Sequence, residues 1–316
     1  MDIMKLRPVG KDYMWGGTKL KKQYNKDIGM KSIAETWECS VHPDGSSKVV
    51  SGEHKGSNLD LIIAEHPEYL GKNNKDGFPV LIKFIDAGKD LSVQVHPDDR
   101  YAHIHEHQNG KTEMWYVMEA EENTSLIYGF ENRISESVVR KAVYEGKITE
   151  YLHYEEVHKG DVFYIPAGTV HAIGKGAVIA EIQQNSNVTY RVYDYDRTDE
   201  NGNKRELHME KALDVMRLEP VRKINSYDDY FECSDYSAKT LCSCRYFTTE
   251  KVNIKKSYDF EVSEDSFQII LCIEGSGTIK NKDDKVSMIK GDCIFFPANI
   301  GRIEVNGSTE FLKVKC

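Results

Sequence analysis

The amino-acid sequence predicts a mainly β protein made of two β-barrels with a few short helices, in which the second barrel is a degenerate copy of the first. Short β-rich runs recur along the chain and end at Gly, Pro, Asn or Asp. Segment 159–167 is repeated at 290–298, which indicates an internal repeat. Helical spacing is limited to three short segments, residues 57–66, 134–151 and 206–216.

Length and composition fit two domains. The chain has 316 residues, of which 40% are hydrophobic, and a single core rarely grows past about 250 to 300 residues. We therefore expect one domain over residues 1–230, which includes the N-terminal segment and the short helices, and a second over residues 231–316. The boundary should lie near residues 226–237.

Composition also indicates the cellular compartment and the classes of partner that are expected. No run approaches the roughly 18 apolar residues that span a bilayer, and residues 1–5 lack the apolar region of a signal peptide. Seven cysteines without an even framework of spacings indicate reduced thiols, so we expect a cytoplasmic protein. The formal charge of −9 argues against nucleic acid as a partner. The sequence leaves open whether the protein is a monomer or a homodimer.

An isolated lysine lies in the first strongly apolar strand. Residues 78–85 read Phe-Pro-Val-Leu-Ile-Lys-Phe-Ile, so Lys83 would be desolvated at a cost unless its amine meets an anion or water. A phosphate would satisfy it. The competing interpretation is a lysine at the surface end of the strand.

Residues 91–96 alternate apolar and polar side chains. The two-residue period of a strand places Ser92, Gln94 and His96 on one face, where Gln94 and His96 can reach one ion. The next candidate is Glu113, which begins another β-rich run after the turn-forming pair Asn109-Gly110. The intervening segment 103–107 holds three histidines without apolar alternation, and we expect it to be a loop at the lip of the pocket.

The segment 159–171 contains a turn, a strand, a break and a histidine. Gly160-Asp161 suits a turn, residues 162–165 are β-rich, and Pro166-Ala167-Gly168 ends the run shortly before His171. This spacing, G-x5-P-x-G-x2-H, resembles the second signature of the cupin barrels. There the histidine joins ligands from an earlier strand pair around a divalent metal.

These residues form a mixed nitrogen and oxygen ligand set. Two imidazoles, one carboxylate and one amide oxygen suit Zn(II), with Mn(II), Co(II) or Fe(II) as alternatives. The four candidates are Gln94, His96, Glu113 and His171.

The second copy of the repeat lacks the predicted metal ligands. The position that corresponds to His171 in the second copy is Arg302, and residues 269–279 predict a strand, a glycine turn and a strand without a Gln-x-His pattern. We therefore expect a structural second barrel and one metal ion per chain.

Together the motifs resemble those of type I mannose-6-phosphate isomerases, in a short bacterial-type form. They occur in the same order and at similar spacing, within residues 7–195. The motifs are residues 13–17, 34–40, 91–98, 110–113 and 166–171, followed by Tyr190-Arg191. The resemblance implies cupin, or jelly-roll-like, β-barrels.

The resemblance also implies a reaction and a set of roles. Mannose 6-phosphate and fructose 6-phosphate would interconvert through an enediol, with one Zn²⁺ held at Gln94, His96, Glu113 and His171. An arginine matching Arg191 serves catalysis, Lys111 is expected to assist ring opening or to hold phosphate, and Ser92, Lys83 and Lys111 match positions near the sugar phosphate. The competing interpretation of Arg191 is a salt bridge to Asp194 or Asp196.

Two other classes of function compete with the isomerase. A non-enzymatic sugar-binding or regulatory cupin would keep the metal pocket, but it predicts the loss of cationic groups such as Lys111 and Arg191. A cupin oxygenase usually needs three imidazoles or a facial triad, which a glutamine ligand disfavours. The general base stays unassigned, because this chain has Asn185-Ser186-Asn187 where longer relatives carry an aspartate before the catalytic arginine.

Overall fold

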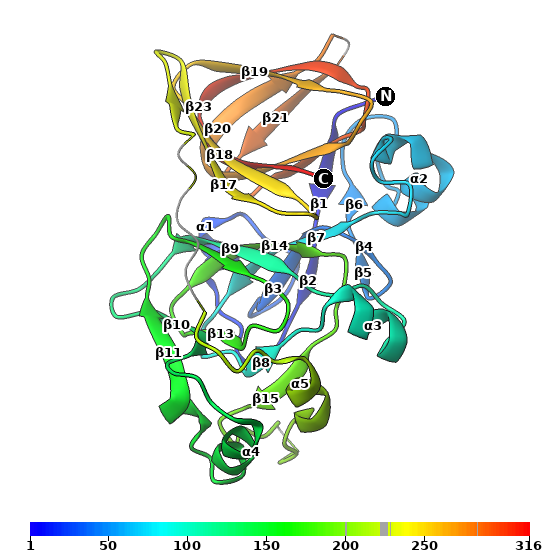
Figure 1. The fold of residues 1–316 in the computed structure, drawn as a ribbon. Coiled ribbons are helices and arrows are strands. Elements are labelled where there is room, and N and C mark those ends of the chain that lie inside the picture. Colours follow the sequence, from blue (N-terminus) through cyan, green and yellow to red (C-terminus); the bar gives the residue numbers. More distant parts are fainter. Residues whose placement is uncertain (200, 222–226, 228, 283) are drawn as a thin grey trace.

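The computed structural model describes residues 1–199, 201–221, 227, 229–282 and 284–316, and it confirms a mainly β fold. Two parts are stacked on each other, with both chain termini on the part built from the C-terminal residues (Figure 1). The helices are α1 (Lys19–Gln23), α2 (Leu59–Glu65), η1 (Pro67–Leu70), α3 (Asp99–His105), α4 (Glu136–Tyr144), η2 (Ile148–Tyr151) and α5 (Met209–Val215).

The first part contains two larger sheets and a small hairpin. The six-stranded sheet has the order β12 (Val162–Ile165), β9 (Glu113–Glu119), β14 (Val178–Gln184), β7 (Val80–Asp86), β3 (Glu35–Cys39) and β2 (Val9–Lys11). The five-stranded sheet has the order β11 (Leu152–Glu156), β10 (Ser125–Phe130), β13 (His171–Ile173), β8 (Val93–Val95) and β15 (Tyr190–Tyr193). The hairpin pairs β4 (Val41–His42) with β5 (Gly45–Ser46).

The second part is a ten-stranded sheet. Its main path runs β16 (Phe231–Glu232), β17 (Tyr236–Ser243), β18 (Thr248–Ile254), β23 (Gly301–Lys315), β20 (Gln268–Lys280), β22 (Cys293–Phe296), β1 (Met4–Arg7) and β6 (Lys48–Val49). The strands β19 (Ser257–Val262) and β21 (Lys285–Ile289) pair with β23 and β20. The N-terminal strand β1 therefore belongs to the C-terminal sheet, and the domain boundary at residue 230 stays a prediction.

Apolar side chains pack on both faces of the six-stranded sheet. Met114 and Tyr116 of β9 pack on the outer face with Leu271 and Phe295 of the C-terminal sheet. Trp115 and Val117 point to the other side, into a cluster that includes Tyr128 of the five-stranded sheet. Because of this two-residue period, one face of β9 contacts the interface between the two parts of the molecule. Its other face lines the space between the two larger sheets of the first part.

The three predicted helices are confirmed, with shorter bounds. Segment 57–66 contains α2, segment 206–216 contains α5, and segment 134–151 contains α4 and η2. Gly146, with φ +70°, separates α4 from η2, since that backbone conformation is unfavourable for other residues.

Two local predictions are wrong. Residues 103–105 belong to α3 rather than to a loop, because the Asp98 side chain accepts a hydrogen bond from the Tyr101 backbone N–H and caps the helix. Residues 269–279 form one long strand, β20, instead of two strands around a glycine turn. Gly275 has φ +74° and a Cβ there would lie 2.2 Å from the Ser308 carbonyl oxygen, so this glycine permits a bulge against β23.

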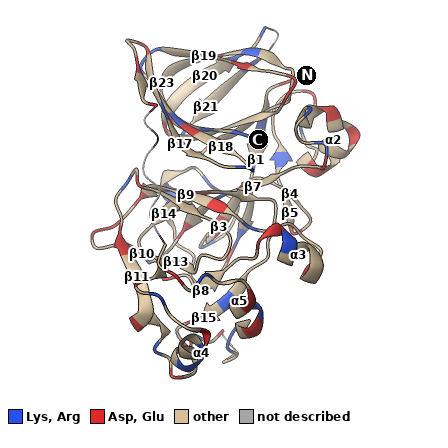
Figure 2. Cartoon of the chain, viewed as in Figure 1, with Lys and Arg blue, Asp and Glu red and all other residues tan. Residues whose placement is uncertain are grey.

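Charge and helix length add two general facts. Lys and Arg are interspersed with Asp and Glu over both parts (Figure 2). Among the helices in the described ranges, none is long and apolar enough to cross a membrane.

Candidate active site

Strand register brings the predicted residues together between the two sheets of the first part. In the five-stranded sheet, Gln94 of β8 is the register partner of both His171 in β13 and Arg191 in β15. In the facing sheet, Glu181 of β14 is the partner of Lys83 in β7. The structure thus assembles the site from residues that lie up to about a hundred positions apart.

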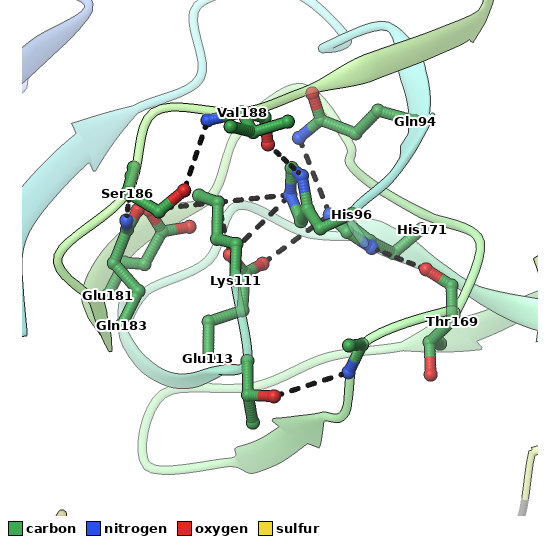
Figure 3. Close-up of polar contacts among 12 residues, drawn as sticks. Gln94, His96, Lys111, Glu113, Thr169, His171, Glu181, Gln183, Ser186 and Val188 are labelled. Atoms are coloured by element: carbon green, nitrogen blue, oxygen red, sulfur yellow. Dashed lines mark hydrogen bonds and ion pairs between the residues drawn. The ribbon is translucent and has the colours of Figure 1, made fainter. Parts of the chain in front are cut away.

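Three predicted ligands form one cluster. The ligand atoms of His96, Glu113 and His171 all lie within 4.8 Å of one another, and all three side chains are buried (Figure 3). The Glu113 carboxylate oxygens lie 3.4 Å from His171 Nε2 and 3.6 Å from His96 Nε2. Two ligands about 2.1 Å from one ion at a tetrahedral angle would be about 3.4 Å apart, so these spacings suit a single metal ion.

Both imidazoles are oriented by backbone carbonyls. His96 Nδ1 lies 2.8 Å from the Val188 carbonyl oxygen, and His171 Nδ1 lies 2.9 Å from that of Thr169. A carbonyl only accepts, so each Nδ1 carries the proton and each Nε2 keeps a free lone pair. Both Nε2 atoms lie near the Glu113 carboxylate, and that of His171 also lies near the Gln94 amide. Gly168 supports this loop, since its N–H donates to the His96 carbonyl oxygen and its φ is +85°.

The protonation states also favour metal binding. Burial, followed by the nearby Lys111, lowers the pKa of His171 to about 4 and that of His96 well below its ordinary value. Both rings are therefore neutral at pH 7, and their close approaches to Glu113 are not ion pairs. Burial and the neighbouring Glu181 raise the pKa of Glu113 to about 7.

The unsatisfied groups show that this set fits a cation. Glu113 Oε1 is buried and has no hydrogen-bond partner in the described part of the chain. The Lys111 ammonium contacts Glu113 Oε2 and lies 3.0 Å from His96 Nε2, so the cluster already attracts positive charge. The Gln94 amide nitrogen lies 3.4 Å from His171 Nε2, and a half-turn of the amide would present its oxygen instead.

Lys83 is buried, so the surface interpretation of this residue is wrong. Its side chain is 6% exposed, and Nζ lies 3.3 Å from Glu181 and 3.6 Å from Glu35. Burial lowers the pKa of Lys83, but Glu35, Glu181 and Glu113 outweigh burial and raise it. The anions that the sequence led us to expect around this lysine are two carboxylates of the protein itself.

We expect Lys83→Met to lower stability strongly, because it leaves the buried carboxylates of Glu35 and Glu181 without their shared cation. The free energy of unfolding should fall by about 3 to 5 kcal/mol in urea denaturation at pH 7. The exposed pair of Lys72 and Glu264 offers a matched control, and Lys72→Met should stay close to the wild type. Equal stability of the two variants would contradict a structural role for Lys83.

A cavity of about 300 Å³ opens beside the cluster. It is lined by the predicted residues Lys83, Ser92, Gln94, Lys111 and Arg191. The wall also contains Tyr13, Glu35 and Asn187, which lie in segments that the sequence motifs cover, and Glu181, Thr189 and Arg205, which no motif marked. Glu181 could have been found by the criterion that marked Lys83, since it is an isolated charge in the apolar run 178–182.

Arg191 faces the cavity from β15 and does not form the competing salt bridge. Its Nη1 donates to the Glu206 carbonyl oxygen at 2.8 Å, and its Nε is buried without a hydrogen-bond partner among the described residues. Asp194 pairs instead with Arg197 and Arg205, and Asp196 pairs with Lys204. The role of Arg191 in catalysis stays a prediction.

The second part contains no matching cluster in the described ranges. Arg302, the counterpart of His171, is exposed and pairs with Asp259 at 2.6 Å. The group of His96, Glu113 and His171 is the one set of potential ligands found among the described residues.

Comparison with known proteins gives a consistent family. Residues 3–125 match the family model of the phosphomannose isomerase type I catalytic domain, and residues 237–316 match that of the mannose-6-phosphate isomerase cupin domain. A mannose-6-phosphate isomerase of Streptococcus mutans is 38% identical over 299 residues, which cover 95% of this chain and 93% of that protein. One of Bacillus subtilis is 37% identical over 305 residues, which cover 96% of each.

Solved structures agree in fold. The crystal structure of the mannose 6-phosphate isomerase from Bacillus subtilis has a TM-score of 0.93 and 36% identity, and the alignment covers 99% of each chain. The apo form of the Salmonella typhimurium enzyme has a TM-score of 0.76 at 16% identity, again over 99% of each chain. At that identity the second likeness concerns the fold alone.

Proposed function

The chain belongs to the type I mannose-6-phosphate isomerase family and is an isomerase, and we propose that it interconverts mannose 6-phosphate and fructose 6-phosphate with one zinc ion through an enediol. The convergence of two neutral imidazoles and a buried carboxylate beside a polar cavity supports this proposal. Membership in an enzyme family removes the non-enzymatic cupin as an alternative.

Four residues would hold the metal. His96, Glu113 and His171 have suitable spacing, and Gln94 presents its amide to the same point. When bound, zinc supplies a Lewis acid that polarises the carbonyl and hydroxyl oxygens of the substrate. The Lys111 ammonium contacts Glu113 Oε2, so it would have to move away from this oxygen when a divalent ion binds.

The residues of the cavity wall would bind the sugar and move its proton. Ser92, Lys83 and Lys111 would line the part of the cavity that receives the substrate, and Arg191 would stabilise the negative charge that develops on the enediolate oxygens. Glu181 is the further carboxylate that we propose for proton transfer between C2 and C1. Burial raises its pKa, but Lys111 and Lys83 outweigh burial, so the pKa is lowered and the carboxylate is ionised at pH 7.

The proposed reaction is tested by turnover of mannose 6-phosphate. Purified protein loaded with zinc should produce fructose 6-phosphate, and removal of the metal by a chelator should stop the reaction. Addition of zinc to the chelated protein should restore it. Zinc-loaded protein that is folded and leaves mannose 6-phosphate unchanged would contradict the proposal.

We expect one metal ion per chain. Elemental analysis of purified protein should give a stoichiometry near one, because Arg302 replaces the histidine in the second part. A reproducible value near two, with one ion that survives His171→Ala, would show a second site in the C-terminal sheet.

We also propose the cytoplasm as the compartment. All seven cysteines are free, as expected of a protein kept in a reducing environment.

A further inference from the structure

Charge is distributed unevenly along the cavity. At its buried end, the two cations Lys83 and Lys111 lie among three carboxylates, those of Glu35, Glu113 and Glu181. All of these side chains are at most 12% exposed. The protein groups at this end are three carboxylates and two ammonium groups, and both lysines are already paired with these carboxylates.

The more exposed end of the cavity has the opposite balance. Arg191 and Arg205 both line the cavity, and they lie close enough for each to affect the other electrostatically. Arg205 Nε donates to Asp194 Oδ2 at 2.8 Å, and Arg205 Nη2 contacts the other oxygen of the same carboxylate. Asp194 also pairs with Arg197, so two guanidinium groups share one buried carboxylate.

The guanidinium groups of Arg197 and Arg205 differ in their remaining donors. Arg197 uses Nη2 for the Asp194 carboxylate, Nη1 for the Asp90 carbonyl oxygen and Nε for the Asp194 carbonyl oxygen. Arg205 uses Nε and Nη2 for Asp194, and its Nη1 has no hydrogen bond to any residue that the structure describes. Asp194 thus fixes the plane of the Arg205 guanidinium while leaving one donor nitrogen for a ligand.

The loop that holds this arrangement is strained. Tyr195 and Asp196 have φ of +56° and +54°, a left-handed conformation that non-glycine residues rarely adopt. Such residues are unfavourable and persist where surrounding contacts impose their conformation. Here those contacts are the pairs that Asp194 forms with Arg197 and Arg205.

We propose that Arg205, positioned by Asp194, binds the phosphate group of the substrate and determines the preference for phosphorylated sugars. The inference rests on the proposed isomerisation of a sugar phosphate, and it adds a specific place for the phosphate, opposite the buried end of the cavity. Arg191 lines the same cavity as Arg205, and it is the register partner of Gln94. A planar guanidinium suits a phosphate, which accepts several parallel hydrogen bonds.

The test is the kinetic effect of Arg205→Gln on the zinc-loaded enzyme. We expect KM for mannose 6-phosphate to rise about 10- to 100-fold while kcat changes less than about threefold, because the phosphate is bound equally in the ground and transition states. The inhibition constant of inorganic phosphate should rise by a similar factor. Arg205→Lys should give an intermediate KM, since it keeps the charge and loses the fork, and it serves as the deciding variant if Arg205→Gln does not fold.

Lys204→Gln is the matched control. Lys204 lies next to Arg205 in the sequence, and Lys204→Gln removes the same charge as Arg205→Gln. The Lys204 amine pairs with Asp196, and its side chain does not line this cavity. Its KM should equal that of the wild type. If the wild-type enzyme had no isomerase activity, the proposed function would be contradicted. If the wild type were active, three results for Arg205→Gln would overturn the inference: a normal KM, a loss of kcat alone, or kinetics equal to those of Lys204→Gln.

Discussion

His96→Ala and His171→Ala are each expected to remove the bound metal and the isomerase activity together. Each change deletes an imidazole whose Nε2 faces Glu113 at 3.6 or 3.4 Å inside a buried cluster. A Lewis acid stabilises the negative charge of the transition state by several kcal/mol, so its loss predicts a kcat at least about 10³-fold lower. Elemental analysis and a turnover assay on the same preparations measure the two effects.

The exposed histidines provide the control. His103, His105 and His107 lie at or beside the end of α3, and all three are exposed. A variant with all three changed to alanine should keep its metal and its activity. If this triple variant lost the metal while His96→Ala kept it, the metal site could not be the buried cluster.

Arg191→Ala should cut kcat by about 10² or more while metal content and KM change little. The reason is that the guanidinium would act on charge that appears mainly in the enediolate, and contacts made only in the transition state affect kcat. Arg191→Lys should recover part of the rate, because a point charge does not reproduce a planar fork of donors. Steady-state kinetics of both variants give kcat and KM separately.

Thermal melting separates this role from a structural one. Asp194 is paired with Arg197 and Arg205, so removal of the Arg191 side chain should leave that ion-pair cluster in place and Tm nearly unchanged. A fully active but destabilised Arg191→Ala would exclude the catalytic role. The kinetics of Arg191→Ala can be compared with those of Arg205→Gln. The change at Arg205 should raise KM, whereas the change at Arg191 should lower kcat.

The sequence predicts the metal cluster because short-range rules place its members. The strand period puts Gln94 and His96 on one face, and the break at Pro166 to Gly168 places His171 at the start of a strand. The structure confirms that these residues and Glu113 meet. The chemistry that each performs stays a prediction, because strand period and turn residues determine position and say nothing of the bound ion.

Other parts depend on contacts between distant residues. Arg205 follows a polar turn without a motif, and only its pairing with Asp194 brings it to the cavity. The three histidines near residue 105 suggested a loop because the segment lacks apolar alternation, whereas the Asp98 cap determines a helix. The place of β1 is equally nonlocal, since three residues near the start of the chain pair with β22.

The pairing of β1 with β22 has a consequence for synthesis on the ribosome. Met4 pairs with Phe295 and Leu6 with Cys293, so the partner strand is made almost 290 residues later. At about 5 to 20 residues per second, the first strand waits roughly 15 to 60 s for its neighbour. During that interval its hydrogen-bonding edge is open to other chains. The ten-stranded sheet can therefore be completed only after β22 has left the ribosome, which makes its assembly a late step of folding.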